Sequence, residues 1–144
     1  MIRYEHTQRG TVLLVTFLVA VLLLLALDRL VPAARGILLT VIGILGMCGF
    51  LFSSLTIQIT DRVLRWQFGL GFIRKEVPLA VIERAEIAET TFLQGWGIHP
   101  TSRGWLYNVS GFQAVVVGLK SGKTFLLGTD EPERLRAALR RALS

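Results

Sequence analysis

The chain has 144 residues, of which 52% are hydrophobic, and its mean hydropathy is +0.56. It is too apolar on average to be one ordinary soluble domain, and too short for many membrane spans. The formal charge of +6 is spread along the chain without a dense basic run, which excludes a dedicated nucleic-acid binder as the expected class.

The N-terminal residues 1–10 are predicted to be a short polar tail. An apolar run follows at residues 11–27, which is at the lower limit of length for a membrane span. The alternative is the apolar core of a signal peptide, because arginines precede it and residues 31–33 loosely resemble a cleavage site. The run is long for that role, and the charged pair Asp28-Arg29 intervenes, so a span is favoured.

The second apolar run, residues 36–55, contains no Asp, Glu, Lys, Arg or His. As a helix it would be about 30 Å long, which is the thickness of a bilayer's hydrocarbon core. The connection at residues 28–35 is short and contains Pro32, which predicts a tight turn. Residues 11–55 are therefore predicted to form a two-helix transmembrane hairpin. The single cysteine, Cys48, lies inside it and excludes an intramolecular disulfide and a Cys-based metal site.

The Lys and Arg residues near the spans predict the orientation of the hairpin. Two lie in the turn, Arg29 and Arg35, whereas the tail and the stretch after the second span together hold six. Because cytoplasmic flanks carry the excess of Lys and Arg, both termini are expected on the cytoplasmic side. The tail 1–10 and the remainder of the chain, 56–144, would then be cytoplasmic.

Small residues recur at helical spacing in the second span. Gly36, Thr40 and Gly43 form one series, and Gly49 with Ser53 repeats it. Such a pattern lets two helices approach closely in lipid. It predicts packing on the hairpin partner, with dimerisation as the less favoured alternative.

After Ser54 the apolar period changes to two, which predicts strands. Residues 55–60 and 63–68 form a predicted hairpin, and a third strand is expected at 72–77. Residues 79–91 are ambiguous, because their glutamates have helical spacing whereas Ala85 and Ile87 fit a strand; a short turn followed by a strand is predicted.

The segment 92–104 holds three glycines and a proline and is predicted to be a long loop. Three more strands are expected near 105–109, 112–119 and 124–127. The chain closes with a predicted helix, in which Asp130 caps the start and Pro132 lies in the first turn. Its apolar stripe comprises Leu135, Ala138, Leu139 and Ala142.

The order of these elements resembles the bacterial pleckstrin-homology-like (PH-like) domains that follow a two-helix membrane anchor. The residues that carry the resemblance are ITDRVLRW (59–66), VPLAVIERAEI (77–87), GWGI (95–98) and GTDEPERLRAAL (128–139). The resemblance implies an α+β fold with a strongly bent antiparallel β-barrel of about seven strands, capped by the C-terminal helix and attached to the membrane α-hairpin. It also implies the inner (cytoplasmic) membrane of a bacterium and a binding or assembly role.

Specific phosphoinositide binding is not expected. Phosphoinositide-binding members of the wider family gather basic residues on a long first loop, whereas the connection here is only about Thr60 to Val63 with one Arg. So short a turn cannot gather several phosphate-binding donors.

The sequence contains few residues that could form a catalytic site. The two histidines, His6 and His99, lie far apart in the chain, and no serine occupies a nucleophile elbow. The segment GLKSGKT (118–124) lacks the spacing of a phosphate loop and is predicted to be a hairpin turn. The expectation is a protein without enzymatic activity, cofactor or metal site.

Aromatic and apolar residues near the predicted long loop are the candidate interaction surface: Phe92, Trp96, Ile98, Trp105 and Tyr107. The alternative for Trp96 is that it folds back to cover the core. Nonspecific contacts with lipid headgroups, worth about 1 kcal/mol per basic residue close to the surface, are expected from four side chains: Arg65, Arg74, Lys75 and Arg103.

The sequence thus predicts a non-enzymatic, membrane-anchored module that binds a protein partner or assembles as a homo-oligomer. The alternatives are an anionic lipid-headgroup sensor and an accessory subunit of a larger membrane complex.

Overall fold

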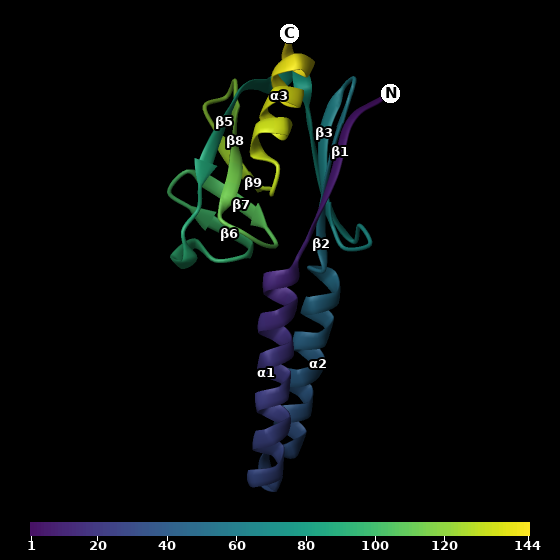
Figure 1. Cartoon of the computed structure of the whole chain (residues 1–144), viewed down its shortest axis with the longest axis vertical. Coiled ribbons are helices and arrows are strands. Elements are labelled where there is room, and N and C mark those ends of the chain that lie inside the picture. Colours follow the sequence, from purple (N-terminus) through teal and green to yellow (C-terminus); the bar gives the residue numbers. More distant parts are fainter.

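The computed structural model describes residues 1–144 and has an α+β architecture, with a helix pair at one end and two β-sheets at the other (Figure 1). The α-helices are α1 (Thr11–Leu30), α2 (Arg35–Leu51) and α3 (Pro132–Leu143). The strands are β1 (Ile2–Arg9), β2 (Ser54–Thr60), β3 (Val63–Phe68), β4 (Ile73–Pro78), β5 (Ile82–Glu89), β6 (Gly97–Thr101), β7 (Gly104–Asn108), β8 (Gln113–Leu119) and β9 (Thr124–Gly128). Short 3₁₀ turns occur at Pro32–Ala34, Leu79–Val81 and Phe92–Gln94.

Helices α1 and α2 form the predicted hairpin, and both are long and apolar enough to cross a membrane. Helix α1 ends at Leu30 instead of the predicted Leu27, so the charged residue Asp28 lies inside it. The Arg35 guanidinium donates two hydrogen bonds to the Asp28 carboxylate, at 3.1 and 3.3 Å. This pairing accommodates the acidic residue at the turn of the hairpin. Helix α2 ends at Leu51, and strand β2 begins at Ser54.

The prediction of a polar tail at residues 1–10 was wrong, because Ile2–Arg9 forms strand β1. It pairs antiparallel with β2, from Arg9 opposite Ser54 to Ile2 opposite Thr60. Its side chains are mostly polar, so it lacks the apolar alternation that identifies a strand in sequence. It is held by backbone pairing to a strand that follows the helix hairpin.

The nine strands make two sheets instead of one barrel of about seven strands. Sheet A has the order β1-β2-β3-β4, and sheet B has the order β5-β8-β9-β7-β6. Within sheet B, β7 and β9 run parallel, which departs from the purely antiparallel arrangement that was predicted. The two sheets are not joined into a closed barrel.

The prediction of a long loop at residues 92–104 was also wrong, because Gly97–Thr101 forms β6 and pairs with β7. Pro100 is tolerated since β6 is the edge strand of sheet B, where a missing N–H breaks no inner ladder. Gly97 and Gly104 adopt φ of 104° and 109°, a region that favours glycine, at the start of β6 and the start of β7.

Most other element predictions are confirmed. The β2–β3 hairpin, the third strand, and the turn followed by a strand in residues 79–91 are all present. Leu135 and Leu139 of α3 are fully buried, which confirms the apolar stripe. The predicted cap was wrong: Glu131 is the N-cap residue without a side-chain bond, and Asp130 instead lies 2.5 Å from His6 Nε2.

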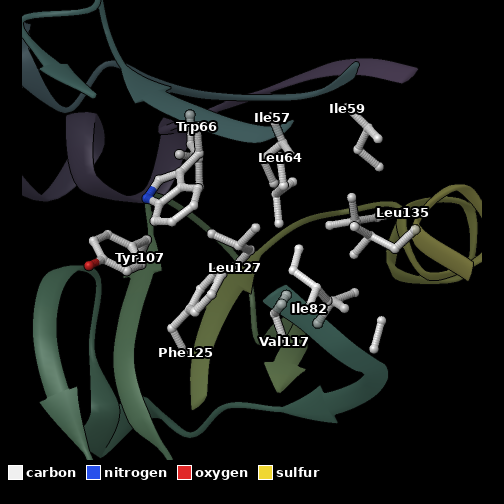
Figure 2. Close-up of a cluster of buried hydrophobic side chains, with 14 of the residues drawn as sticks. Ile57, Ile59, Leu64, Trp66, Ile82, Tyr107, Val117, Phe125, Leu127 and Leu135 are labelled. Atoms are coloured by element: carbon white, nitrogen blue, oxygen red, sulfur yellow. The ribbon is translucent and has the colours of Figure 1, made fainter. Parts of the chain in front are cut away.

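The core lies between the two sheets, and α3 packs against one end of it (Figures 1 and 2). Figure 2 shows Leu64 and Trp66 of sheet A facing Val117 and Leu127 of sheet B, with Leu135 contributed by α3. All are almost completely buried, so apolar burial from both sheets and the helix stabilises this part of the chain.

Strand β1 leads into α1, and α2 leads into β2, with almost no linker between strand and helix. Gly10 joins β1 to α1, and its N–H donates to the Ser53 carbonyl at 2.8 Å. A Cβ on Gly10 would lie 2.6 Å from the Phe52 carbonyl oxygen, so only glycine fits this approach. The end of the two sheets that adjoins α1 and α2 is called the helix-proximal end below.

Candidate functional site

A cleft opens between the two sheets, beside the free edge of β4. It has a volume of about 380 Å³ and lies between β3 and β4 of sheet A and β7 and β9 of sheet B. We call it the inter-sheet cleft. Its lining comprises Trp66, Lys75, Glu76, Val77, Trp105, Tyr107, Leu119, Lys123, Thr124 and Phe125.

Aromatic rings form the inner part of the inter-sheet cleft. Trp66 stacks on Phe125 with ring centroids 4.9 Å apart, and its ring lies 5.1 Å from that of Tyr107 (Figure 2). Trp66 is only 3% exposed, and its indole N–H has no hydrogen-bond partner. Trp105, in contrast, is 51% exposed. The cleft therefore offers mainly apolar surface, and the Trp66 N–H buried behind it has no hydrogen-bond partner in the chain.

The other lining groups give the inter-sheet cleft a positive rim. The Lys75 ammonium donates to the Tyr107 hydroxyl at 3.0 Å and lies 5.3 Å from the centre of that ring. Lys123 is exposed and makes no ion pair. The one carboxylate, Glu76, is neutralised by Arg65 at 2.8 Å. An acidic ligand is therefore electrostatically favoured over a basic one.

The four basic residues predicted to contact headgroups do not form one site. Arg65, Arg74 and Lys75 line a shared hollow with Glu76 on strands β3 and β4. Arg103 lies in the β6–β7 turn and lines a different hollow.

The five residues predicted as an interaction surface also divide. Trp105 and Tyr107 line the inter-sheet cleft, although Tyr107 is buried. Ile98 is half-buried and packs against the main core. Phe92 and Trp96 lie together elsewhere, with ring centroids 5.7 Å apart.

Trp96 is half-buried and does not belong to the main core cluster. Its indole N–H donates to the Gly111 carbonyl at 3.1 Å, and its ring lies 5.9 Å from that of Phe112. Trp96 thus packs on the β7–β8 turn, whereas Phe92 remains exposed.

Sequence reasoning missed the contribution of Trp66, Phe125 and Lys123 to the cleft. Trp66 lies between Arg65 and Gln67 in the alternating pattern of β3, and Phe125 lies in the short apolar strand β9, so neither position differs in sequence from an ordinary strand residue. Lys123 follows Ser121-Gly122 in a turn, where a lysine is unremarkable in sequence. The pairing of β7 with β9 places Trp105 opposite Phe125, and the facing of the two sheets brings Trp66 against them.

The small residues of α2 have two different environments. A Cβ on Gly49 would lie 3.2 Å from the Phe17 ring, so this residue packs against α1. Gly36 and Gly43 have no neighbouring atom within 4 Å of such a Cβ. The predicted packing on the hairpin partner is therefore seen at Gly49 but not along the whole series.

Two groups near the strand ends have shifted pKa values. Burial, followed by the nearby Glu131 carboxylate, raises the pKa of the Tyr4 hydroxyl to about 12. Hydrogen bonds from the N-terminal amine and from Arg3 lower the pKa of the exposed Asp61 carboxyl. Both groups lie outside the inter-sheet cleft.

Comparison with known proteins identifies no family model, no curated protein and no solved structure that matches the chain.

Proposed function

We propose that the protein is a membrane-anchored, non-enzymatic interaction module. Helices α1 and α2 span a bacterial cytoplasmic membrane, and the sheets lie on the cytoplasmic side. The inter-sheet cleft binds an extended, acidic segment of a protein partner.

The anchor is supported by the length, composition and exposure of the helix pair. The two candidate spans, Thr11–Leu30 and Pro32–Leu51, have 20 residues each, and the second consists of the 3₁₀ turn Pro32–Ala34 and α2. Their length is close to the thickness of the hydrocarbon core, and little of either is buried within the chain. Large side chains such as Leu22, Leu23 and Ile44 are exposed, which suits a lipid environment. The excess of Lys and Arg on the side of the sheets supports the cytoplasmic orientation.

We also propose that the two sheets and α3 are a divergent PH-like arrangement. Two facing sheets with a C-terminal helix packed at one end of the core support this relationship. The parallel β7–β9 pair and the strand contributed from before the helices are departures from it.

The single observation that carries the proposed binding role is the inter-sheet cleft at the free edge of β4. Since β4 pairs only with β3, its outward backbone groups have no strand partner and can accept an added strand. An apolar side chain of that strand would contact Trp105 and Phe125. Acidic side chains would face Lys75 and Lys123.

The lipid-sensor alternative has weaker support, because Arg103 lies apart from the other three basic residues. A second copy of the chain, or a larger membrane complex to which it is an accessory, remains compatible with the same cleft. The experiment below distinguishes these partners by the mass of the adduct.

The test is photo-crosslinking in intact membranes, with a photoreactive residue in place of Trp105. We expect a defined protein adduct whose yield falls about fivefold in the Lys123→Glu variant, equivalent to about 1 kcal/mol for an exposed ion pair. Lys120→Glu is the matched control, since Lys120 is exposed in the same turn but does not line the cleft. An adduct that forms equally in both variants, or the absence of an adduct, would refute the proposed site.

A further inference from the structure

Five large apolar side chains are exposed at the helix-proximal end of the sheets. Their exposed fractions range from 48% to 95%. We call this set the collar: Leu70 and Phe72 in the β3–β4 turn, Phe92 and Leu93 after β5, and Phe112 before β8.

The first part of the collar lies against the end of α2. The Gly69 N–H donates to the Ser54 carbonyl at 2.9 Å. A Cβ on Gly69 would lie 2.8 Å from the carbonyl oxygen of Leu51, and Leu51 is the last residue of α2. The β3–β4 turn that carries Leu70 and Phe72 is thus fixed beside this helix end.

The second part of the collar lies against the start of α1. Gln8 donates its side-chain N–H to the Ser110 carbonyl at 2.9 Å, and the Ser110 hydroxyl lies 3.5 Å from that of Thr11. Phe112 follows this turn, and Trp96 links it to Phe92 through its bond to Gly111 and its ring contacts.

Figure 1 shows the β3–β4 turn and the segment between β5 and β6, which carry most of the collar residues, on opposite sides of the helix pair, near the level where the helices meet the sheets. Exposed apolar residues that occur singly need no explanation. The collar residues, however, lie beside the start of α1 and the end of α2, two helices whose own surface is apolar. Aromatic side chains are favoured at the boundary between hydrocarbon and headgroups. The apolar surface of the helices therefore continues outward into the collar.

We propose that the collar inserts into the interfacial layer of the bilayer on both sides of the helix pair. This rests on the proposed membrane insertion of α1 and α2. Together with the helix pair, the two inserted parts hold the sheets in one orientation. Lys75 is two residues along β4 from Ile73 at the β3–β4 turn, or about 7 Å of strand, so the inter-sheet cleft is held close to the headgroups.

The test uses nitroxide labels on the full chain in vesicles of mixed neutral and anionic lipids. Labels are attached in the Leu93→Cys and Phe72→Cys variants, each in a Cys48→Ser background. The control is Val81→Cys, an exposed apolar position in the β4–β5 connection, which contacts α3 and lies away from α1 and α2. Leu22→Cys reports on the middle of α1.

We expect both collar labels to be several-fold more accessible to oxygen, relative to a water-soluble nickel reagent, than the label at position 81. If the collar labels have the same relative accessibility to oxygen as the label at position 81, while the label at position 22 lies in lipid, the collar does not insert. That result would overturn this inference and leave the proposed anchor intact. A water-accessible label at position 22 would overturn the proposed anchor itself. Collar labels shielded from both reagents would indicate a protein contact and also overturn the inference.

Discussion

The junction at Gly10 should tolerate no side chain. In Gly10→Ala, the new Cβ would meet the Phe52 carbonyl oxygen at 2.6 Å and the Ser53 carbonyl oxygen at 3.2 Å. Relief requires α1 to move away from the end of α2, which breaks the 2.8 Å bond from the Gly10 N–H to Ser53. The lost hydrogen bond costs about 1 kcal/mol, and overpacking costs about 1–3 kcal/mol. We therefore expect the free energy of unfolding to fall by about 2–4 kcal/mol.

The assay is urea unfolding of the full chain in a mild detergent, followed by tryptophan fluorescence, since Trp66 is buried in the core. The matched control is Gly46→Ala, because a Cβ on Gly46 has no neighbour within 4 Å. The control should unfold at the midpoint of the unaltered chain or above it, since alanine favours the helix. Equal midpoints for the two variants would refute the argument that the junction is sterically closed.

Three further substitutions test other parts of the structure by the same unfolding measurement. Leu139→Ala removes a fully buried side chain of α3 and should cost about 2–5 kcal/mol; a loss below about 1 kcal/mol would mean that α3 does not close the core. Tyr4→Phe removes a buried hydroxyl without a hydrogen-bond partner and should not destabilise the chain at neutral pH. The folded pKa of Tyr4 is raised from 10.0 to about 12, so above pH 10 the hydroxyl ionises more readily in the unfolded chain than in the folded one. The free energy of unfolding should therefore fall as the pH rises from 10 toward 12, and Tyr4→Phe should abolish that fall. Asp61 has the opposite sign: its lowered pKa stabilises the fold above the usual value of 3.8 and less as the pH falls below it, so Asp61→Asn should flatten the acid side of the stability profile.

Local periodicity was sufficient for much of the fold. The apolar runs predicted α1 and α2, alternation predicted β2 and β3, and the stripe containing Leu135 and Leu139 predicted α3. Strand β1 could not be predicted this way, because it is polar and its partner follows the helix hairpin. Strand β6 was hidden by Pro100 and the glycines at its boundaries, which are typical of loops.

The candidate site was predictable only as separate residues. The residue types alone predicted Trp105 as part of an interaction surface and Lys75 as a basic contact residue. Their grouping with Trp66 and Phe125 depends on the parallel pairing of β7 with β9 and on the facing of two sheets. Neither long-range relation has a local sequence pattern, so Arg103 was assigned to a group from which the structure separates it.

The position of β1 before the helix pair and β2 after it has a consequence for biogenesis. During synthesis β1 emerges first and stays unpaired until the chain has passed through both helices and returned as β2. If only one helix crossed the bilayer, β1 and β2 would lie in different compartments, and sheet A would be left with an open edge at β2. Under the proposed insertion, completion of sheet A thus requires both helices to cross the membrane, and a chain with only one helix inserted would carry an unpaired strand edge.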